Sequence, residues 1–245
     1  MCFTGVAKKR DYSIQKLANE TAIVGSADPL KDQALEQLQE LIVTGELEPG
    51  SKLLETQIAS RLGVSRATLR EAMARLNEVG LLVYHPYRGT YVRGLYVSDL
   101  EEIFSFRTGL EKMAFQLCWN KRNLVNLADL EMRNQYLSKC ISDNDAYGAI
   151  VSELHLHSWC YELSQHKLLF QAWERLRPNL QFYFALHQKA HGRSGPQRKS
   201  HDTYINLAKG DSLEHMLNHL DDHMQQGLET TKSFLSRESD LPPNR

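Results

Sequence analysis

The sequence has few cysteines, no long apolar run and no leader-like start. Its four cysteines, Cys2, Cys118, Cys140 and Cys160, show no C-x-x-C spacing. A zinc knuckle or a thiol redox pair is therefore not expected, and the thiols are predicted to be reduced. No stretch supplies the roughly 20 apolar residues that a membrane-spanning helix needs. The N-terminal residues also lack the basic-then-apolar order of a signal peptide. These absences predict a cytoplasmic protein with no membrane partner.

Charge is balanced over the whole chain but not within it. The formal net charge of the 245 residues is −1. Between Arg61 and Arg93, however, there are six arginines and only two glutamates. Such a local excess of cations favours a polyanionic partner such as nucleic acid. The length is sufficient for two modest domains, each with its own core.

The stretch from Pro49 to Arg93 has the pattern of two short helices joined by a tight turn at Gly63, which crosses a left-handed conformation at low cost. Ser65 is placed to cap the second helix by accepting the N–H of Ala67 or Thr68. Gly80 is placed as its left-handed C-terminal residue. The apolar positions recur at helical spacing: Leu54, Ile58 and Leu62 in the first helix, and Leu69, Met73 and Leu76 in the second.

Two short β-rich runs, 81–84 and 90–92, follow the helix pair and flank a turn at 85–89. This arrangement predicts a hairpin. A helix pair followed by such a wing is typical of a winged helix-turn-helix, which places its second helix in the major groove of DNA.

Several side chains of this stretch suit DNA. Arg66 and Arg70 are four residues apart and so share one helix face, with Thr68 beside them. The planar guanidinium matches guanine O6 and N7 as well as phosphate oxygens. Arg88 and Gly89 lie at the tip of the predicted wing, within reach of a neighbouring groove or phosphate. The alternative is a small helical subdomain whose basic face is merely solvated.

Four motifs occur here in order: G-E-L-x-P-G-x-x-L, I-A-x-x-L-G-V-S-R-x-x-L-R-E-A, L-x-x-x-G-L-L and R-G-x-Y-V. Together they resemble the GntR family of bacterial transcription regulators, over about residues 30–93. The resemblance implies that a double-stranded DNA operator is contacted at Arg66, Thr68, Arg70 and Gly89, with Ala67 and Thr56 at the margins. Some members have a basic residue near the Thr56 position and a hydroxyl at Ala67, so the operator sequence stays open.

The chain is predicted to be mainly α, with a winged helix-turn-helix of three helices and a hairpin at 28–93. A linker at 94–97 joins it to an all-helical bundle at 98–236. An N-terminal arm (1–27) and a C-terminal tail (237–245) complete the chain. The arm contains a possible short helix at 14–23, and its Lys8, Lys9 and Arg10 either contact DNA or lie in solvent.

After Val92 only helical patterns remain. The first helix of the bundle is expected to begin with a capping box from Ser98 to Glu101, and Pro178 is expected to interrupt and kink the fourth. Before the winged motif, Asp28-Pro29 is expected to open the first helix of the chain. The helices of the bundle are predicted at about 98–120, 126–141, 144–164, 167–190, 197–209 and 212–236.

This helical region resembles the ligand-sensing FCD domain of the FadR-like subfamily. Arg107 with Leu110-Glu111 matches its R-x-x-L-E signature, and Leu156-His157 with the following Leu163-Ser164 matches a later segment. Either Arg107 forms a simple helix-surface pair with Glu111, or it points into the bundle and binds the carboxylate of a small-molecule effector. The resemblance favours an inward role.

Nine of the ten histidines lie after residue 150, and imidazole is a frequent ligand of transition metals. Glu153 and His157 share a helix face, and His155 points elsewhere. His215, His219 and His223 form a stripe on the last helix. The subfamily commonly binds a divalent metal through Asp-x-x-x-His and two later histidines. Carried over, the ligands of Zn, Ni or Mn are Glu153, His157, His201 and His223, with His219 as the rival for the last position. The alternative is a polar interior of hydrogen-bonded histidines without metal.

Three functions compete at this point. The first is a homodimeric transcription regulator whose bundle binds a metal and an organic acid, because a single motif of this size buries too little DNA to be selective. The second is a metal-dependent hydrolase or isomerase with an accessory nucleic-acid module. No H-E-x-x-H, G-x-S-x-G or phosphate-cradling loop supports it. The third, an architectural DNA binder, leaves the bundle without a role.

Overall fold

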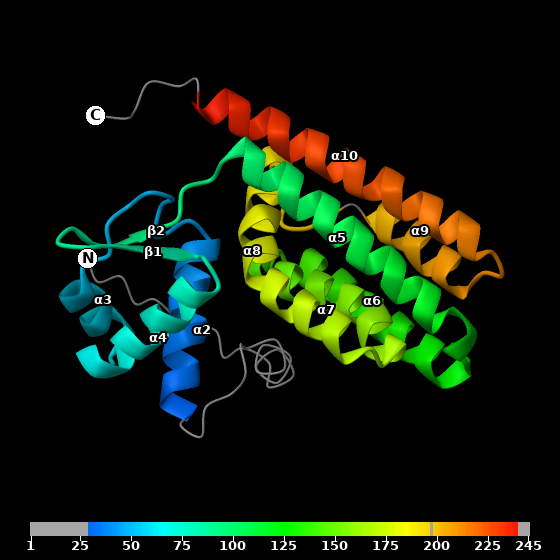
Figure 1. The fold of residues 1–245 in the computed structure, drawn as a ribbon, viewed down its shortest axis with the longest axis horizontal. Helices are drawn as coiled ribbons and strands as arrows, with labels where there is room; N and C mark the ends of the chain where they lie inside the picture. The colour runs from blue at the N-terminus through cyan, green and yellow to red at the C-terminus, as the bar shows by residue number, and fades with distance from the viewer. Residues whose placement is uncertain (1–28, 197, 240–245) are drawn as a thin grey trace.

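The computed structural model describes residues 29–196 and 198–239. The predicted helix at 14–23 and the basic residues Lys8, Lys9 and Arg10 lie outside these ranges. Figure 1 shows two parts, a small one that carries the only hairpin of the described residues and a larger one made of helices. None of the helices formed by the described residues is both long and apolar enough to cross a bilayer.

The smaller part is a winged helix-turn-helix, as predicted. The turn between its second and third helices passes through Gly63 at φ 66°, and the Ser65 hydroxyl accepts the N–H of Thr68 at 3.1 Å. Leu35, Leu38, Ile42, Leu69 and Leu76 are fully buried in its core. Its elements are α2 (Pro29–Val43), α3 (Glu55–Leu62), α4 (Arg66–Glu78), β1 (Leu82–His85) and β2 (Gly89–Val92), with β1 antiparallel to β2.

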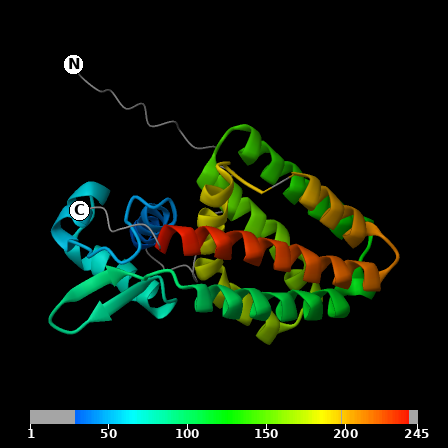
Figure 2. The same ribbon diagram turned by 90° about the horizontal axis from the view of Figure 1, so that it is seen from above.

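The larger part is an all-helical bundle whose helices begin and end within a few residues of the predicted bounds. Helix α7 is buried along most of its length, so it forms the centre of the bundle. Figure 2 shows α5 and α10 running alongside each other across it. The elements are α5 (Val97–Cys118), the short 3-10 helix η1 (Trp119–Lys121), α6 (Leu124–Ser142), α7 (Ala146–Ser164), α8 (Lys167–His191), α9 (Arg198–Lys209) and α10 (Leu213–Ser239).

Two local predictions are wrong. Ser98 lies inside the first turn of α5, and no side chain caps that helix. An ion pair between Arg93 and Asp99, at 2.6 Å, holds the helix start instead. Pro178 does not interrupt α8, which continues from Lys167 to His191. Arg177, Pro178 and Leu180 are all buried, and this packing supports the helix where the proline lacks an N–H donor.

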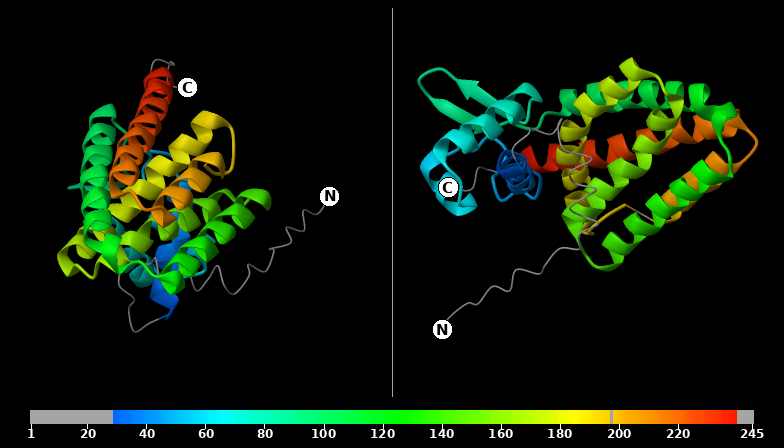
Figure 3. Two further views of the ribbon diagram at one scale, coloured as in Figure 1. Left: turned by 90° about the vertical axis from the view of Figure 1, so that its right-hand side faces the viewer. Right: turned by 90° about the horizontal axis from the view of Figure 1, so that it is seen from below.

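The two parts meet along α8, which lies beside α2 (Figure 3). Phe182 of α8 is buried in the apolar cluster of the winged helix-turn-helix. Its neighbour Gln181 accepts a hydrogen bond from Gln39 of α2. Asn179 donates its side-chain N–H to the carbonyl of Val79, at the end of α4, at 2.8 Å. Helix α8 therefore contacts both α2 and the end of α4.

Candidate functional site

The first candidate surface is the exposed face at the start of α4. Arg66 and Arg70 are both exposed there, as their spacing predicts. The structure adds an acid: Glu55 Oε2 at the start of α3 is 2.8 Å from Arg70 Nε and 3.7 Å from Arg66 Nη2. These pairs hold the two guanidinium groups on one side of the helix. Local sequence patterns carry no signal for these pairs, because the pairs join different helices.

The remaining predicted residues of this surface differ in exposure. Thr56 and Ala67 are exposed. Thr68 is half-buried, and its hydroxyl lies 2.8 Å from the Ser65 hydroxyl. Thr68 therefore supports the helix start that presents Arg66 and Arg70, in addition to lying beside them.

The wing adds a second exposed group. Arg88 is exposed, and Gly89 has φ 98°, a conformation that any other residue adopts only with strain. Two further residues were missed by the sequence interpretation. Tyr87 at the tip is fully exposed with φ 64°, and exposed Lys52 lies against Gly89 and pairs with β2 opposite Tyr91. Only the folding of the segment before α3 onto the wing brings Lys52 there.

The second candidate site is a group of three histidines inside the bundle. His157 of α7, His201 of α9 and His223 of α10 each offer a ring nitrogen, and these atoms all lie within 4.8 Å of one another. His219 is outside this group and stacks on His223, with the ring centroids 5.6 Å apart. Metal ions in proteins are commonly bound by such convergent imidazoles.

Glu111 of α5 fixes the orientation of His157. Its Oε1 lies 2.6 Å from His157 Nδ1 and accepts a hydrogen bond from the Tyr204 hydroxyl at 3.0 Å. If Nδ1 donates to this carboxylate, Nε2 keeps its lone pair, and Nε2 is buried with no hydrogen-bond partner among the described residues. A carboxylate behind a histidine in this way is typical of metal sites. Helical spacing pairs Glu111 only with Arg107, so this role of Glu111 could not be predicted from the sequence.

The protonation of these groups suits ligation. Burial lowers the pKa of His157 and His223, so both imidazoles are neutral at neutral pH. Burial alone would raise the pKa of Glu111, but the hydrogen bonds from His157 and Tyr204 and the positive charge of Arg107 oppose it and hold that pKa below its usual value. Neutral imidazoles and an ionised carboxylate behind them are the forms that a metal requires.

Glu153 lies beside the histidine group but is not part of it. Its Oε1 is 3.5 Å from His201 Nε2. Burial raises the pKa of Glu153 to about 7, although Arg107 and Arg193 oppose that change. Its place in the predicted ligand set stays a prediction.

Arg107 combines the two roles left open by the sequence. It is only 2 % exposed, so it points inward, and its Nε is 3.5 Å from Glu111 Oε2. The guanidinium carbon lies 5.0 Å from the centre of the Phe184 ring. Nε and Nη2 are buried without a hydrogen-bond partner among the described residues. Buried N–H groups of this kind are expected to bind an acceptor.

A cavity of about 400 Å³ adjoins these side chains. Its walls come from α5, α7, α8, α10 and the segment between α8 and α9. It includes Arg107, Glu153, His223 and Arg193, together with the apolar side chains Phe104, Phe184 and Met224. A volume of several hundred Å³ with a few convergent polar groups is typical of a small-molecule site.

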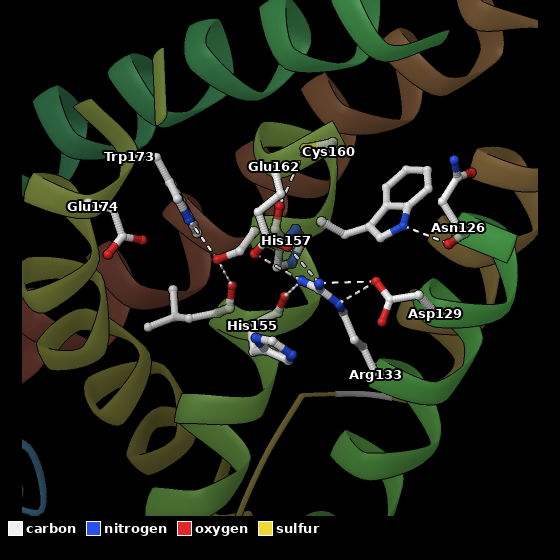
Figure 4. Close-up of polar contacts among 12 residues, drawn as sticks. Asn126, Asp129, Arg133, His155, His157, Cys160, Glu162, Trp173 and Glu174 are labelled. Atoms are coloured by element: carbon white, nitrogen blue, oxygen red, sulfur yellow. Dashed lines mark hydrogen bonds and ion pairs between the residues drawn. The ribbon is translucent and has the colours of Figure 1, made fainter. Parts of the chain in front are cut away.

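The opposite side of α7 is fixed by Arg133 of α6 (Figure 4). Arg133 donates to Asp129 at 3.0 Å, to Glu162 at 2.6 Å and to the carbonyl of His155 at 2.9 Å. Because this network ties α6 to two points of α7, it holds the helix that carries His157. The side chain of His155 is not in the histidine group, as its spacing predicts.

Comparison with known proteins agrees with this architecture. A winged helix-turn-helix joined to an all-helical domain is the architecture to be matched. The model of the bacterial regulatory proteins, gntR family, matches residues 30–92, and the FCD domain model matches residues 102–226. The chain belongs to the GntR family and carries an FCD domain.

Similar proteins cover most of the chain. An HTH-type transcriptional regulator of Bacillus subtilis, YdhC, is 26% identical over 83% of this chain and 91% of its own length. The gluconate operon repressor of Bacillus licheniformis is 23% identical over 75% of this chain and 77% of its own. Among solved structures, Escherichia coli McbR/YncC has a TM-score of 0.69 at 23% identity, covering 84% of this chain and 98% of that one. The fold is therefore that of known GntR regulators.

The comparisons decide between the competing functions. These relatives are transcription regulators, so the chain is a DNA-binding transcription regulator and not an enzyme. The hydrolase or isomerase hypothesis is not supported.

Proposed function

We propose that this regulator binds a divalent metal and a small carboxylic acid in its FCD domain, and that the acid changes operator binding by a homodimer. The observation that carries the proposal is the convergence of ring nitrogens from His157, His201 and His223 within 4.8 Å of one another, with Glu111 at His157 Nδ1. Nothing in ordinary core packing requires three imidazole nitrogens to converge.

The metal would be held by His157, His201 and His223, with Glu153 as a candidate fourth ligand. His219 is the weaker alternative, because it lies outside the converging group. Three imidazoles and a carboxylate suit Zn, Ni or Mn. When bound, the metal would supply positive charge beside the cavity. Arg107 offers buried N–H donors to the carboxylate of the effector.

On the DNA side, Arg66 and Arg70 of α4 would bind base edges or phosphates in the major groove, with Thr56, Ala67 and Thr68 beside them. Arg88 and Gly89 of the wing would contact the adjacent backbone. Two chains on a pseudo-palindromic operator would double these contacts. An acid that binds two arrangements of the protein with different affinity would shift their populations.

Elemental analysis of the purified, untagged protein tests the metal. The expected result is about one transition metal per chain, lost in His157→Ala and retained in His215→Ala. His215 is the matched control, because it is exposed on the same helix as His223. His219→Ala should also retain the metal, and circular dichroism should confirm that each variant folds. A wild-type protein that takes up no metal after reconstitution would refute the proposed centre.

A further inference from the structure

The cavity beside the histidine group contains a second cation in addition to Arg107. Arg193 follows the end of α8 and lines the cavity near His191 and Pro196. Its Nε is buried without a hydrogen-bond partner among the described residues. Arg107 enters the same cavity from α5, is only 2 % exposed, and lies over the Phe184 ring. Two guanidinium groups from different elements thus offer to one space N–H donors that lack hydrogen-bond partners in the described part of the chain.

The acids around the cavity leave these donors without hydrogen bonds among the described residues, although Arg107 Nε forms an ion pair with Glu111 Oε2 at 3.5 Å. Glu153 interacts electrostatically with both arginines, yet no hydrogen bond forms to Arg107 Nε or Nη2 or to Arg193 Nε. Glu111 Oε1 accepts from Tyr204 and faces His157. Glu229, on the cavity wall, accepts a hydrogen bond from Gln225 at 2.9 Å. Buried N–H donors of a cation without an acceptor are costly, so a ligand that supplies acceptors at both arginines would be favoured.

We propose that the effector is a dicarboxylate, with one carboxylate bound at Arg107 and the other at Arg193. This inference rests on the proposed function and makes the effector class of the same site specific. The apolar side chains Phe104, Phe184 and Met224 in the cavity wall suit a short hydrocarbon spacer between the two acid groups. Arg193 is then the residue that distinguishes a diacid from a monoacid.

Calorimetric titration of the metal-loaded full chain with adipate and with hexanoate tests this assignment, because the two acids have the same chain length. Adipate is expected to bind about tenfold or more tightly, as one additional charge-assisted hydrogen bond would give. Arg193→Gln should reduce adipate binding to the level of hexanoate and leave hexanoate unchanged. Arg193→Lys should keep part of the preference, because a cation remains.

Arg175→Gln is the control, because Arg175 is exposed on α8 and does not line the cavity. Equal affinity of the two acids for the wild type, or no binding of either, would overturn the proposal. So would an Arg193→Gln variant that keeps the preference for adipate. The proposed function is tested separately, by measuring operator affinity with and without adipate in an anisotropy assay. Adipate that binds but leaves operator affinity unchanged would contradict the proposed function and not the dicarboxylate assignment.

Discussion

Glu55 is the residue that controls how the two arginines of α4 are presented. It pairs with both in the absence of DNA. DNA phosphates that bind these arginines must therefore displace the Glu55 carboxylate or bind beside its negative charge. Glu55→Gln is expected to strengthen DNA binding by roughly 0.5–1 kcal/mol, the usual worth of exposed ion pairs. Fluorescence anisotropy with operator and random duplexes measures this change. Glu46→Gln, an acid paired with Arg61 on the same domain, is the control. Unchanged affinity for both duplexes would contradict a competing role for Glu55.

Arg66 and Arg70 are expected to contribute directly to DNA binding. Arg66→Ala or Arg70→Ala should weaken specific binding by about 1–3 kcal/mol if the side chain contacts a base edge. If it contacts only phosphate, operator and random DNA should weaken equally. Arg175→Ala, an exposed arginine outside α4 and the wing, should have no effect. Two variants that bind the operator as tightly as the wild type would show that α4 is not the recognition helix.

Glu111 is expected to tune the metal without binding it. Replacing it by Gln removes the charge behind His157 but keeps a similar shape. Metal affinity should fall about 10- to 100-fold, the typical effect of removing a carboxylate behind a ligating histidine. Competition with a chromogenic chelator measures the affinity, and circular dichroism checks the fold. Glu162→Gln, whose acid pairs with Arg133 on the other side of α7, should keep wild-type affinity.

At the scale of elements, α8 is the connection between the cavity and the DNA-binding part. Phe184, His187 and His191 line the cavity, while Asn179, Gln181 and Phe182 contact the winged helix. Any shift of α8 on ligand binding would therefore be transmitted to α2 and to the end of α4. The coupling between the cavity and the DNA-binding part is measured by the ratio of operator affinities with and without the acid bound.

Asn179 gives a test of this coupling. Asn179→Ala removes the hydrogen bond to the Val79 carbonyl, at a cost of about 1 kcal/mol in stability. Metal and acid binding should be unchanged, but the effect of the acid on operator affinity should become smaller. Asn206→Ala, on α9 and away from this contact, is the control. An undiminished response would show that the signal does not pass through Asn179.

At the scale of the whole molecule, the proposed homodimer places two copies of the chain on the operator. A duplex with both half-sites should bind two chains, as measured by analytical ultracentrifugation, and should be bound far more tightly than a single half-site. The logarithm of the binding constant should fall linearly with the logarithm of salt, by about 0.9 for each neutralised phosphate. One chain per full operator, or equal affinity for a half-site, would contradict the dimer.

Much of the fold was predictable from local patterns. The apolar spacing of Leu69, Met73 and Leu76 and the cap at Ser65 were sufficient to place α4, because these signals act within one or two helical turns. The same reasoning failed at Ser98 and Pro178, where an ion pair from Arg93 and buried packing outweighed the local preference. Motif resemblance supplied the candidate residues of both sites and favoured His223, with His219 left as its rival.

By itself, the sequence determined the order of the elements, the basic surface of α4 and the histidine-rich character of the bundle. Only the tertiary structure brought Glu111 to His157, Glu55 to Arg66 and Arg70, and Asn179 to Val79. Helical spacing determines which residues share a face, and the packing of helices far apart in the chain determines what that face meets. The convergence of His157, His201 and His223 is the result of that packing.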